Sequence, residues 1–497
     1  MNMVDLVTPP LGLAYVAAAV RAAGHDVTVV DAVGSAIEKF TAHPRGHLHG
    51  LTIAEIVEAV PAAADAIGVS VQYSYDWPVS RTLIDRLRER FPRVLLLAGG
   101  EHITALPGFS VEQSGIDVAV LGEGEAAAVA VLDAWASEGR AGFGRIPGVS
   151  YRTDSGAVAF SRKGVRELNL DAIPRPAWDL LPIEEYLSRH YGFGVDRGRS
   201  LPVMASRGCP FECTFCSSPG MWTTKWLARD PNDLLDEIAD LQRRYQAQNF
   251  DFYDLTMIVK RQWIIDFCQA IERRGMSFVW QLPSGTRSEG IDGEVTRWLY
   301  RTGCRNVSYS PESGSVDTLK AIKKKVKVAR LLGSMRAAVK NDLNVKFSMI
   351  FGFPHERLRH IIESFIFLMR AAALGVHDVS IWVFVPYPGS ELFHQLRANG
   401  RISKLDDEFF YRLASYADIT QTFSYCEALG RRALLTLRVL GTLIFYATSW
   451  LLRPWRPLVM LWRAAAGQAE SRAEMVLRTL LRRARRSLRL RQSVEAG

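Results

Sequence analysis

The sequence has few cysteines, six in 497 residues, and three of them, Cys268, Cys304 and Cys426, are scattered without a pattern. Isolated cysteines are typical of buried thiols in a reducing compartment, and they argue against a disulfide framework. The N-terminus lacks the basic segment and apolar run of an export signal. We therefore expect a cytoplasmic protein, which at this length has room for several folded domains.

Long hydrophobic runs are also missing. The longest apolar run covers residues 439–452, and these fourteen residues are fewer than the ~20 needed to cross a bilayer. Arginine and tryptophan follow directly, in Arg453-Pro-Trp-Arg-Pro457. This composition favours a segment that lies in a membrane interface or packs on the catalytic domain.

An excess of positive charge is absent from most of the chain. The net charge is +9, but residues 431–497 alone carry +11, which leaves −2 for everything before them. We therefore expect no nucleic-acid partner. Residues 472–491 alternate arginine with Val, Leu and Ala at roughly helical spacing, which suggests a basic amphipathic helix on anionic lipid. A solvated tail is the alternative.

The other three cysteines are concentrated in one short segment. Cys209, Cys213 and Cys216 have the spacing Cys-x3-Cys-x2-Cys. Three thiolates can hold three irons of a [4Fe-4S] cube and leave the fourth iron open to a ligand that is not protein. Structural zinc would need a fourth Cys or His, and none follows within the next fifty residues. The segment therefore predicts a cluster with one open iron, held by these three cysteines.

Residues 1–135 alternate between helical segments and short apolar runs. We expect helices at residues 9–23, 52–60 and 78–90, and strands at residues 26–31, 66–71, 94–100 and 118–124. Apolar runs that end in Gly or Ser and alternate with helices predict a doubly wound parallel sheet. Ligands bind beyond the carboxyl ends of such strands.

Residues 136–195 predict a connector. The segment 144–156 suggests a small hairpin. Prolines around residues 174–176 favour extended, stiff chain.

Residues 196–400 predict a second α/β unit. Strands are expected at residues 202–206, 250–255, 277–281, 306–310, 346–351 and 379–384, and helices at residues 231–245, 262–274, 294–301, 329–341 and 361–374. Six strands separated by helices predict an open or partial (β/α)6 barrel, whose functional groups lie at the strand carboxyl ends. The cysteine segment directly follows the first of these strands. Residues 401–497 then form a helical, basic C-terminal region.

The cysteine spacing, with Phe215 before the last cysteine, resembles the radical S-adenosylmethionine (SAM) enzymes. The resemblance implies that SAM fills the open iron site and that its reductive cleavage yields a 5′-deoxyadenosyl radical. It also implies roles for six residues. Phe215 would lie against the adenine, Asp254 near the methionine amino group, Arg287 near its carboxylate, Glu312 and Ser313 at the ribose, and Gly352 beside the adenine. In Glu312-Ser-Gly314, the preceding Ser310 and Pro311 depart from the usual residues.

Three N-terminal segments resemble the cobalamin-binding domain of one radical SAM subgroup: Pro-Pro-Leu-Gly-Leu-Ala-Tyr from Pro9, Gly-Gly-x-His from Gly99, and Gly-Glu-Gly-Glu from Gly122. The resemblance then covers residues 9–388. It implies that cobalamin contacts the loops after the strands, at Ser70, Gln72, Gly99, Gly100, Glu101, Gly122, Glu123 and Gly124.

The sequence departs from other cobalamin proteins in two ways. No Asp-x-His-x-x-Gly occurs, so cobalamin is expected to bind without a lower axial histidine. Family members usually have a strand well before Pro9, where this chain has only residues 1–8. Either the sheet lacks its first strand or the true start lies further upstream.

Together the two cofactors imply a radical SAM enzyme similar to the class B methylases. The expected reaction is methylation of an unactivated carbon, less often phosphorus, of a small-molecule or lipid-like substrate. One alternative is cyclisation or rearrangement without methyl transfer, as in the similarly built anaerobic cyclases. Another is a cobalamin or redox sensor without turnover. No residue stands out as a catalytic acid or base.

The resemblance also implies partners. An electron donor such as flavodoxin or ferredoxin is expected, because SAM cleavage is reductive. The basic C-terminal region extends the expectation of a cytoplasmic protein to one that contacts the inner surface of the membrane.

Overall fold

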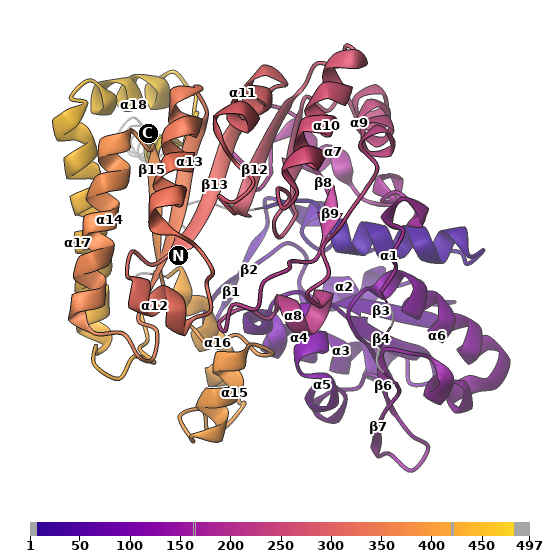
Figure 1. Ribbon diagram of the computed structural model, residues 1–497. Helices are drawn as coiled ribbons and strands as arrows, with labels where there is room; N and C mark the ends of the chain where they lie inside the picture. Colours follow the sequence, from indigo (N-terminus) through magenta and orange to yellow (C-terminus); the bar gives the residue numbers. More distant parts are fainter. Residues whose placement is uncertain (1–6, 163, 165, 419–421, 482–497) are drawn as a thin grey trace, which may run out of the picture.

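The structure is a computed structural model that describes residues 7–162, 164, 166–418 and 422–481. Figure 1 shows an N-terminal α/β domain in indigo and purple, a partial barrel in magenta to orange, and C-terminal helices in yellow on the outside of the barrel. The predicted fold class is confirmed.

The N-terminal domain is built on a five-stranded sheet. Its order is β3 (Ala66–Ser70), β4 (Leu95–Gly99), β5 (Val118–Val120), β6 (Val149–Arg152) and β7 (Val158–Phe160). The first three strands are parallel, and the predicted hairpin of the connector continues the sheet as antiparallel β6 and β7. The sheet is therefore mixed.

Helices cover both faces of this sheet, as expected for a doubly wound domain. Leu95 and Leu97 pack toward α1 (Leu11–Ala22) and α6 (Gly124–Glu138). Leu96 and Ala98 pack on the opposite face. That face carries α3 (Trp77–Arg90), α4 (Glu101–Ala105) and α5 (Pro107–Gln113), while α2 (Ile53–Ala59) packs on α3. The alternation follows from the two-residue period of a strand.

The prediction of a strand at residues 26–31 is wrong. This segment has no strand partner among the described residues. In the flavodoxin-like order 2-1-3-4-5 the second strand pairs only with the first, and no described strand precedes this one. Val27 and Val29 pack instead beneath α1. Asp31 accepts hydrogen bonds from the Gly34 N–H at 3.0 Å and the Tyr186 hydroxyl at 2.8 Å.

Two further elements accompany this segment. A hairpin of β1 (Phe40–His43) and β2 (Gly46–His49), which the sequence analysis did not predict, follows it. The connector then adds α7 (Ile183–Ser188), which supplies Tyr186. The connector is thereby fastened to the N-terminal domain.

The second domain is a six-stranded parallel partial barrel, as predicted. Its strands pair in chain order: β8 (Ser200–Val203), β11 (Asn249–Phe252), β12 (Val279–Thr286), β13 (Cys304–Glu312), β14 (Asn344–Phe351) and β15 (Asp378–Val383). In the described chain β15 does not pair with β8, so the barrel stays open.

Helices surround the barrel, and five of them lie at the predicted places. These five are α9 (Pro231–Tyr245), α10 (Arg261–Arg273), α11 (Gly293–Arg301), α13 (Val328–Lys340) and α14 (Leu358–Leu374). The short helix α12 (Val316–Ala321) was not predicted. Their ends follow ordinary capping rules: the Asp230 carboxylate accepts from the N–H groups of Asn232 and Asp233 at the start of α9. One core formed by strand and helix side chains runs through the domain.

Further helices follow the barrel in the described part of the chain. They include α15 (Glu391–Ala398), α16 (Asp407–Leu413), α17 (Arg431–Leu452) and α18 (Arg456–Ala465). Residues 472–481 are helical, and the rest of the predicted basic helix lies outside the described residues. By length and composition, α17 alone among the described helices is long and apolar enough to cross a membrane.

One face of α17 packs on the barrel. Its buried positions, Leu434, Arg438, Gly441, Phe445 and Ser449, recur every three or four residues and face α14 and β15. The predicted packing of the apolar run on the catalytic domain is therefore confirmed for this face. Only 33% of the most apolar 18-residue stretch of α17 is buried, so about two thirds of this stretch lies outside the core.

Candidate active site

The cysteine loop leaves the carboxyl end of the first barrel strand. After β8 the chain forms β9 (Ser206–Arg207), which pairs with β10 (Leu227–Ala228), and the loop ends in α8 (Ser218–Trp222). Gly208 turns the chain at φ +87°, where a Cβ would lie 2.3 Å from the Lys225 carbonyl oxygen, so only glycine fits. The loop is held by the Thr214 N–H, which donates to the Ile322 carbonyl at 3.1 Å.

The three cysteines lie near one another on this loop. The pKa of each thiol responds to the charge of another: that of Cys209 to Cys216, that of Cys213 to Cys209, and that of Cys216 to Cys213. Three such thiolates can hold three irons of a [4Fe-4S] cube. Their assignment to the cluster stays a prediction.

Two buried cations face this loop. Burial raises the pKa of Cys213, and the charges of Lys324 and Arg287 oppose that rise. The Arg287 guanidinium lies 3.5 Å above the centre of the Phe211 ring and donates to Glu289 at 2.6 Å. Two basic side chains therefore lie beside the cysteine loop, and the predicted contact of Arg287 with the SAM carboxylate stays a prediction.

Glu312 lies at the end of β13 and is paired with Lys324. The Lys324 ammonium is 2.8 Å from the Glu312 carboxylate, and both side chains are buried. Glu312 has φ +67°, an uncommon conformation that for non-glycine residues often occurs at functional sites. Ser313 turns toward α14, where its hydroxyl is 3.2 Å from that of Ser364. The ribose contacts of Glu312 and Ser313 remain predictions.

The structure places Asp254 against the strand that enters the cysteine loop. Its carboxylate accepts hydrogen bonds from the Ala205 N–H at 3.1 Å and from the Ser206 hydroxyl. Burial raises the pKa of Asp254 to about 6. Asp254 thus positions the loop, and its predicted contact with the SAM amino group stays a prediction.

Phe215 contacts the turn that begins with Gly352 at the end of β14. The Phe215 ring lies 5.6 Å from the ring of Phe353, the residue after Gly352. The adenine contacts of Phe215 and Gly352 remain predictions. Glu356 closes the turn by accepting from the Gly352 N–H at 2.6 Å and the Phe353 N–H at 3.2 Å.

Glu356→Gln is expected to change the pH dependence of stability. Burial raises the pKa of Glu356 from 4.5 to about 7, so the native state binds a proton that the unfolded state has lost between these values. The stability of the wild type should therefore fall relative to E356Q as the pH rises from 4.5 to 7, by about 3 kcal/mol, and stay constant above. Urea unfolding across this range checks it, and parallel curves for the two proteins would contradict it.

The predicted cobalamin loops lie at the carboxyl ends of β3, β4 and β5. Ser70, the last residue of β3, and Gln72 are exposed. Gly99 ends β4 and Gly100 follows it, while the segment from Gly122 to Gly124 leads from β5 into α6. His102 is fully buried against Trp77, and burial lowers its pKa to about 3. This histidine therefore has a structural place, consistent with cobalamin binding without an axial histidine.

Two of these loops contact the cysteine loop directly. Glu101 accepts a hydrogen bond from the hydroxyl of Ser217, the residue after Cys216. Glu123 is 3.2 Å from the Arg166 guanidinium, and Glu125 is 2.6 Å from that of Arg207. The carboxylates thus join the two domains, and cobalamin contacts by their side chains remain predictions.

Sequence reasoning missed the cations of this junction. Arg207 stands two residues before Cys209 and is buried under the rings of Tyr15 and Trp222. Its place inside the cysteine segment was the available signal. Lys324, which pairs with Glu312 inside the barrel, and Arg166, which pairs with Glu123, had none, because no local motif marks either pair.

A cluster of tyrosines also went unrecognised. Tyr73 and Tyr75 follow β3 and stack at 5.2 Å, and Tyr387, after β15, lies 6.1 Å from Tyr416. Tyr73 is 50% exposed, yet burial raises its pKa to about 12, with Tyr416 and Glu101 adding to the rise. The cluster therefore gathers where the carboxyl ends of both sheets meet.

Gly100→Ala is expected to disrupt the cobalamin site. Gly100 has φ +113°, and a Cβ there would lie 2.4 Å from the Val71 carbonyl oxygen. The strain of about 1–3 kcal/mol should displace the loop and weaken cobalamin binding about tenfold or more. Titration with hydroxocobalamin, followed by absorbance, measures it.

Gly68→Ala is the matched control. Gly68 lies within β3, and a Cβ there meets only Leu97 at 3.9 Å. Equal cobalamin affinity in the two variants would show that the Gly100 loop does not hold the cofactor.

Comparisons with known proteins agree with this geometry. The B12 binding domain family matches residues 1–132, and the Radical SAM superfamily matches residues 203–368. A Pyrococcus horikoshii protein named "Uncharacterized methyltransferase PH0819" is 30% identical over 80% of each chain. An anaerobic magnesium-protoporphyrin IX monomethyl ester cyclase of Synechocystis is 27% identical over 72% of this chain and 67% of its own. The hopanoid C-3 methylase of Methylococcus capsulatus is 25% identical over 78% and 68%.

A solved structure shares the fold. The radical SAM methyltransferase TsrM from Kitasatospora setae, with cobalamin and a [4Fe-4S] cluster bound, aligns with a TM-score of 0.64 at 17% identity. The alignment covers 80% of this chain and 73% of that one.

Two cofactor-binding domains joined at the cysteine loop define a radical SAM enzyme with a cobalamin domain. The chain belongs to the cobalamin-binding radical SAM family. Its cofactors are a [4Fe-4S] cluster, SAM and cobalamin.

Proposed function

We propose that this enzyme methylates an unactivated carbon, less often phosphorus, of a small-molecule or lipid-like substrate. The observation that carries the proposal is the contact of Glu101 with Ser217, which sets the loop after β4 against the cysteine loop. A radical formed at one cofactor and a methyl group carried by the other would then meet the substrate in one place. Methyltransferases among the relatives support the same reaction.

The bound cofactors supply the difficult chemistry, reductive SAM cleavage and methyl transfer, and the protein supplies position and charge. We assign Cys209, Cys213 and Cys216 to the cluster and Arg287 to the SAM carboxylate. Phe215 and Phe353 would enclose the adenine. The tyrosines at the domain junction suit an apolar or aromatic substrate, because aromatic rings offer large contact areas with few polar groups.

Cyclisation without methyl transfer is the second candidate, favoured by the similarity to the cyclase of Synechocystis. A non-catalytic sensor is the third. Anaerobic reconstitution followed by dithionite and SAM separates the three.

Each set of products supports one candidate. 5′-Deoxyadenosine together with S-adenosylhomocysteine, in equal amounts during methylation, supports the methylase. 5′-Deoxyadenosine alone would support cyclisation and overturn the methylase. Formation of neither product would support a sensor.

We also propose that a flavodoxin or ferredoxin reduces the cluster, and that the enzyme works in the cytoplasm at the membrane surface. Support for the membrane contact comes from large apolar side chains that stay exposed on three neighbouring helices. They include Ile362 and Ile366 on α14, Leu443 and Leu451 on α17, and Leu458 and Trp462 on α18. Figure 1 shows these helices together on one side of the barrel. Exposed apolar residues mixed with tryptophan and arginine are typical of proteins that lie in a membrane interface.

A further inference from the structure

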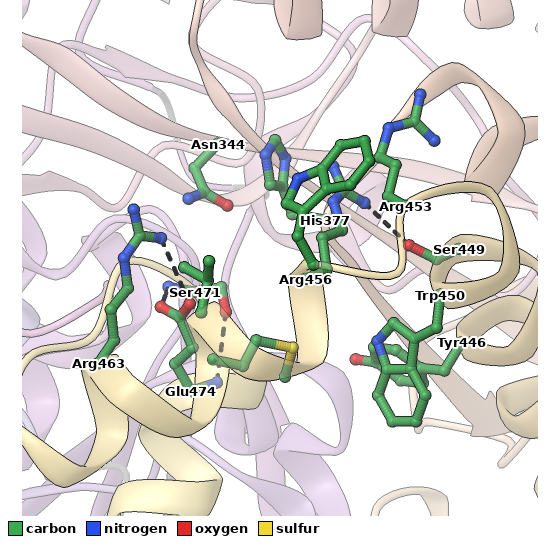
Figure 2. A pocket seen from close by; sticks show the side chains of 13 residues that line it. Asn344, His377, Tyr446, Ser449, Trp450, Arg453, Arg456, Arg463, Ser471 and Glu474 are labelled. Atoms are coloured by element: carbon green, nitrogen blue, oxygen red, sulfur yellow. Dashed lines mark hydrogen bonds and ion pairs between the residues drawn. The ribbon is translucent and has the colours of Figure 1, made fainter.

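A cavity of about 420 Å³ lies at the end of the barrel opposite the cysteine loop. It is formed where α17 ends and α18 begins, beside the amino ends of β14 and β15. Its lining includes Arg453, Arg456, Arg463, His377, Trp450 and Trp455. Figure 2 shows the arginines and His377 around one space. The cavity is separate from the active site.

Two of the arginines have no acidic partner. Arg453 donates to the carbonyls of Ala372 and Ala373 at 3.2 and 3.1 Å. Arg456 donates to the Gly375 carbonyl at 2.6 Å and to the Ser449 hydroxyl at 2.9 Å. Among the described residues no carboxylate lies within 4.0 Å of either guanidinium. Each guanidinium has five N–H donors, so donors remain for an anion.

The third arginine is engaged by two carboxylates. Arg463 lies 3.0 Å from Glu470 and 3.4 Å from Glu474, which also lines the cavity. Arg453 and Arg456 are therefore the arginines of the cavity that remain available to an anion.

His377 adds a neutral donor. Its Nδ1 accepts from the Val345 N–H at 3.1 Å, which places the ring proton on Nε2. Burial and the charges of Arg456, Arg453 and Arg463 lower the pKa of His377 to about 3. The ring is therefore neutral at neutral pH and can donate one hydrogen bond, from Nε2.

Apolar side chains are exposed on the two helices that form this cavity. Trp455, which lines the cavity, is 58% exposed. Leu451 on α17 is 82% exposed, and Leu458 and Trp462 on α18 are 69% and 65% exposed. A cationic pocket beside exposed Trp and Leu matches an amphiphile whose phosphate enters the pocket while its chains lie along the helices.

We propose that this cavity binds the phosphate of an anionic phospholipid when α17 and α18 rest on a membrane. Arg453 and Arg456 hold the phosphate, and the Nε2–H of His377 donates to it. The inference rests on the membrane contact proposed above and deepens it by naming the lipid group recognised and the residues that bind it.

Cosedimentation of the full protein with vesicles tests the proposal. The vesicles contain phosphatidylcholine alone or with phosphatidylglycerol. The double variant R453Q/R456Q should bind the anionic vesicles about thirtyfold more weakly than wild type, since two arginines near an anionic surface contribute about 1 kcal/mol each and about 1.4 kcal/mol is tenfold. The variant R432Q changes an exposed arginine at the other end of α17 and controls for the loss of charge alone. If the double variant does not fold, the single variant R453Q takes its place.

The outcomes separate this inference from the membrane contact itself. A variant with Trp455, Leu458 and Trp462 changed to serine should lose binding to all vesicles, and undiminished binding by it would overturn the membrane contact. If that variant loses binding but R453Q/R456Q behaves like R432Q, the lipid pocket alone is overturned. Binding of inorganic phosphate that depends on both arginines, without any effect of these arginines on vesicle binding, would also overturn it in favour of a free-phosphate site.

Discussion

Replacing Cys213 by alanine is expected to remove the cluster and to stop SAM cleavage. Cys213 is the most buried of the three loop cysteines, and its loss leaves two thiolates for three irons. Because losing even an outer-shell partner of a metal costs about 10–100-fold in affinity, losing a ligand should cost more than about a hundredfold. Iron content, the charge-transfer absorbance of the cluster and the yield of 5′-deoxyadenosine measure the effect.

Cys268→Ala is the control for this experiment. Cys268 is fully buried in α10, on the outside of the barrel. This variant should keep its iron and its SAM cleavage. If C213A also kept both, the assignment of the cluster to the three-cysteine loop would fail.

Replacing Lys324 by methionine is expected to destabilise the barrel by about 3–5 kcal/mol, because it leaves the buried Glu312 carboxylate without its partner. Burial opposes the charged form of Lys324, but Glu312 and then Cys213 raise its pKa overall. The stabilisation is therefore complete at neutral pH and is lost only as the pH rises through the raised pKa. We expect the melting temperature to fall by on the order of 10 °C.

The double variant E312Q/K324M separates charge from packing. It removes both charges and should recover much of the stability lost in K324M. Calorimetry of the three proteins measures this, together with SAM affinity by equilibrium dialysis. If the double variant were no more stable than K324M, the ion pair would not be the cause of the loss.

The barrel could be predicted almost element by element, and the N-terminal domain only in part. Strands such as β14 are apolar runs bounded by clear helix signals, so local pattern and tertiary structure agree. The segment 26–31 has the same apolar pattern but found no neighbouring strand. A strand needs a partner, and a local pattern cannot show whether that partner is present.

The residues of the candidate site also divide into those that the sequence could predict and those that it could not. Cys209, Cys213 and Cys216 could be recognised because their spacing is local. Lys324 and the contact of Glu101 with Ser217 could not, since residues 101 and 217 meet only after both domains have folded. The predicted contact of Asp254 with SAM stays a prediction, and its hydrogen bonds to Ala205 and Ser206 could be found only from the structure.

The hydrogen bond between Glu101 and Ser217 has a consequence for how the holoenzyme assembles. Whatever fixes the loop of Glu101 also fixes the chain next to Cys216. By thermodynamic reciprocity, if loading of vitamin B12 strengthens retention of iron, then iron must strengthen retention of the vitamin by the same factor. Preparations deficient in one cofactor should then lose the other more readily, so supplying both during maturation would yield more intact enzyme than supplying either alone.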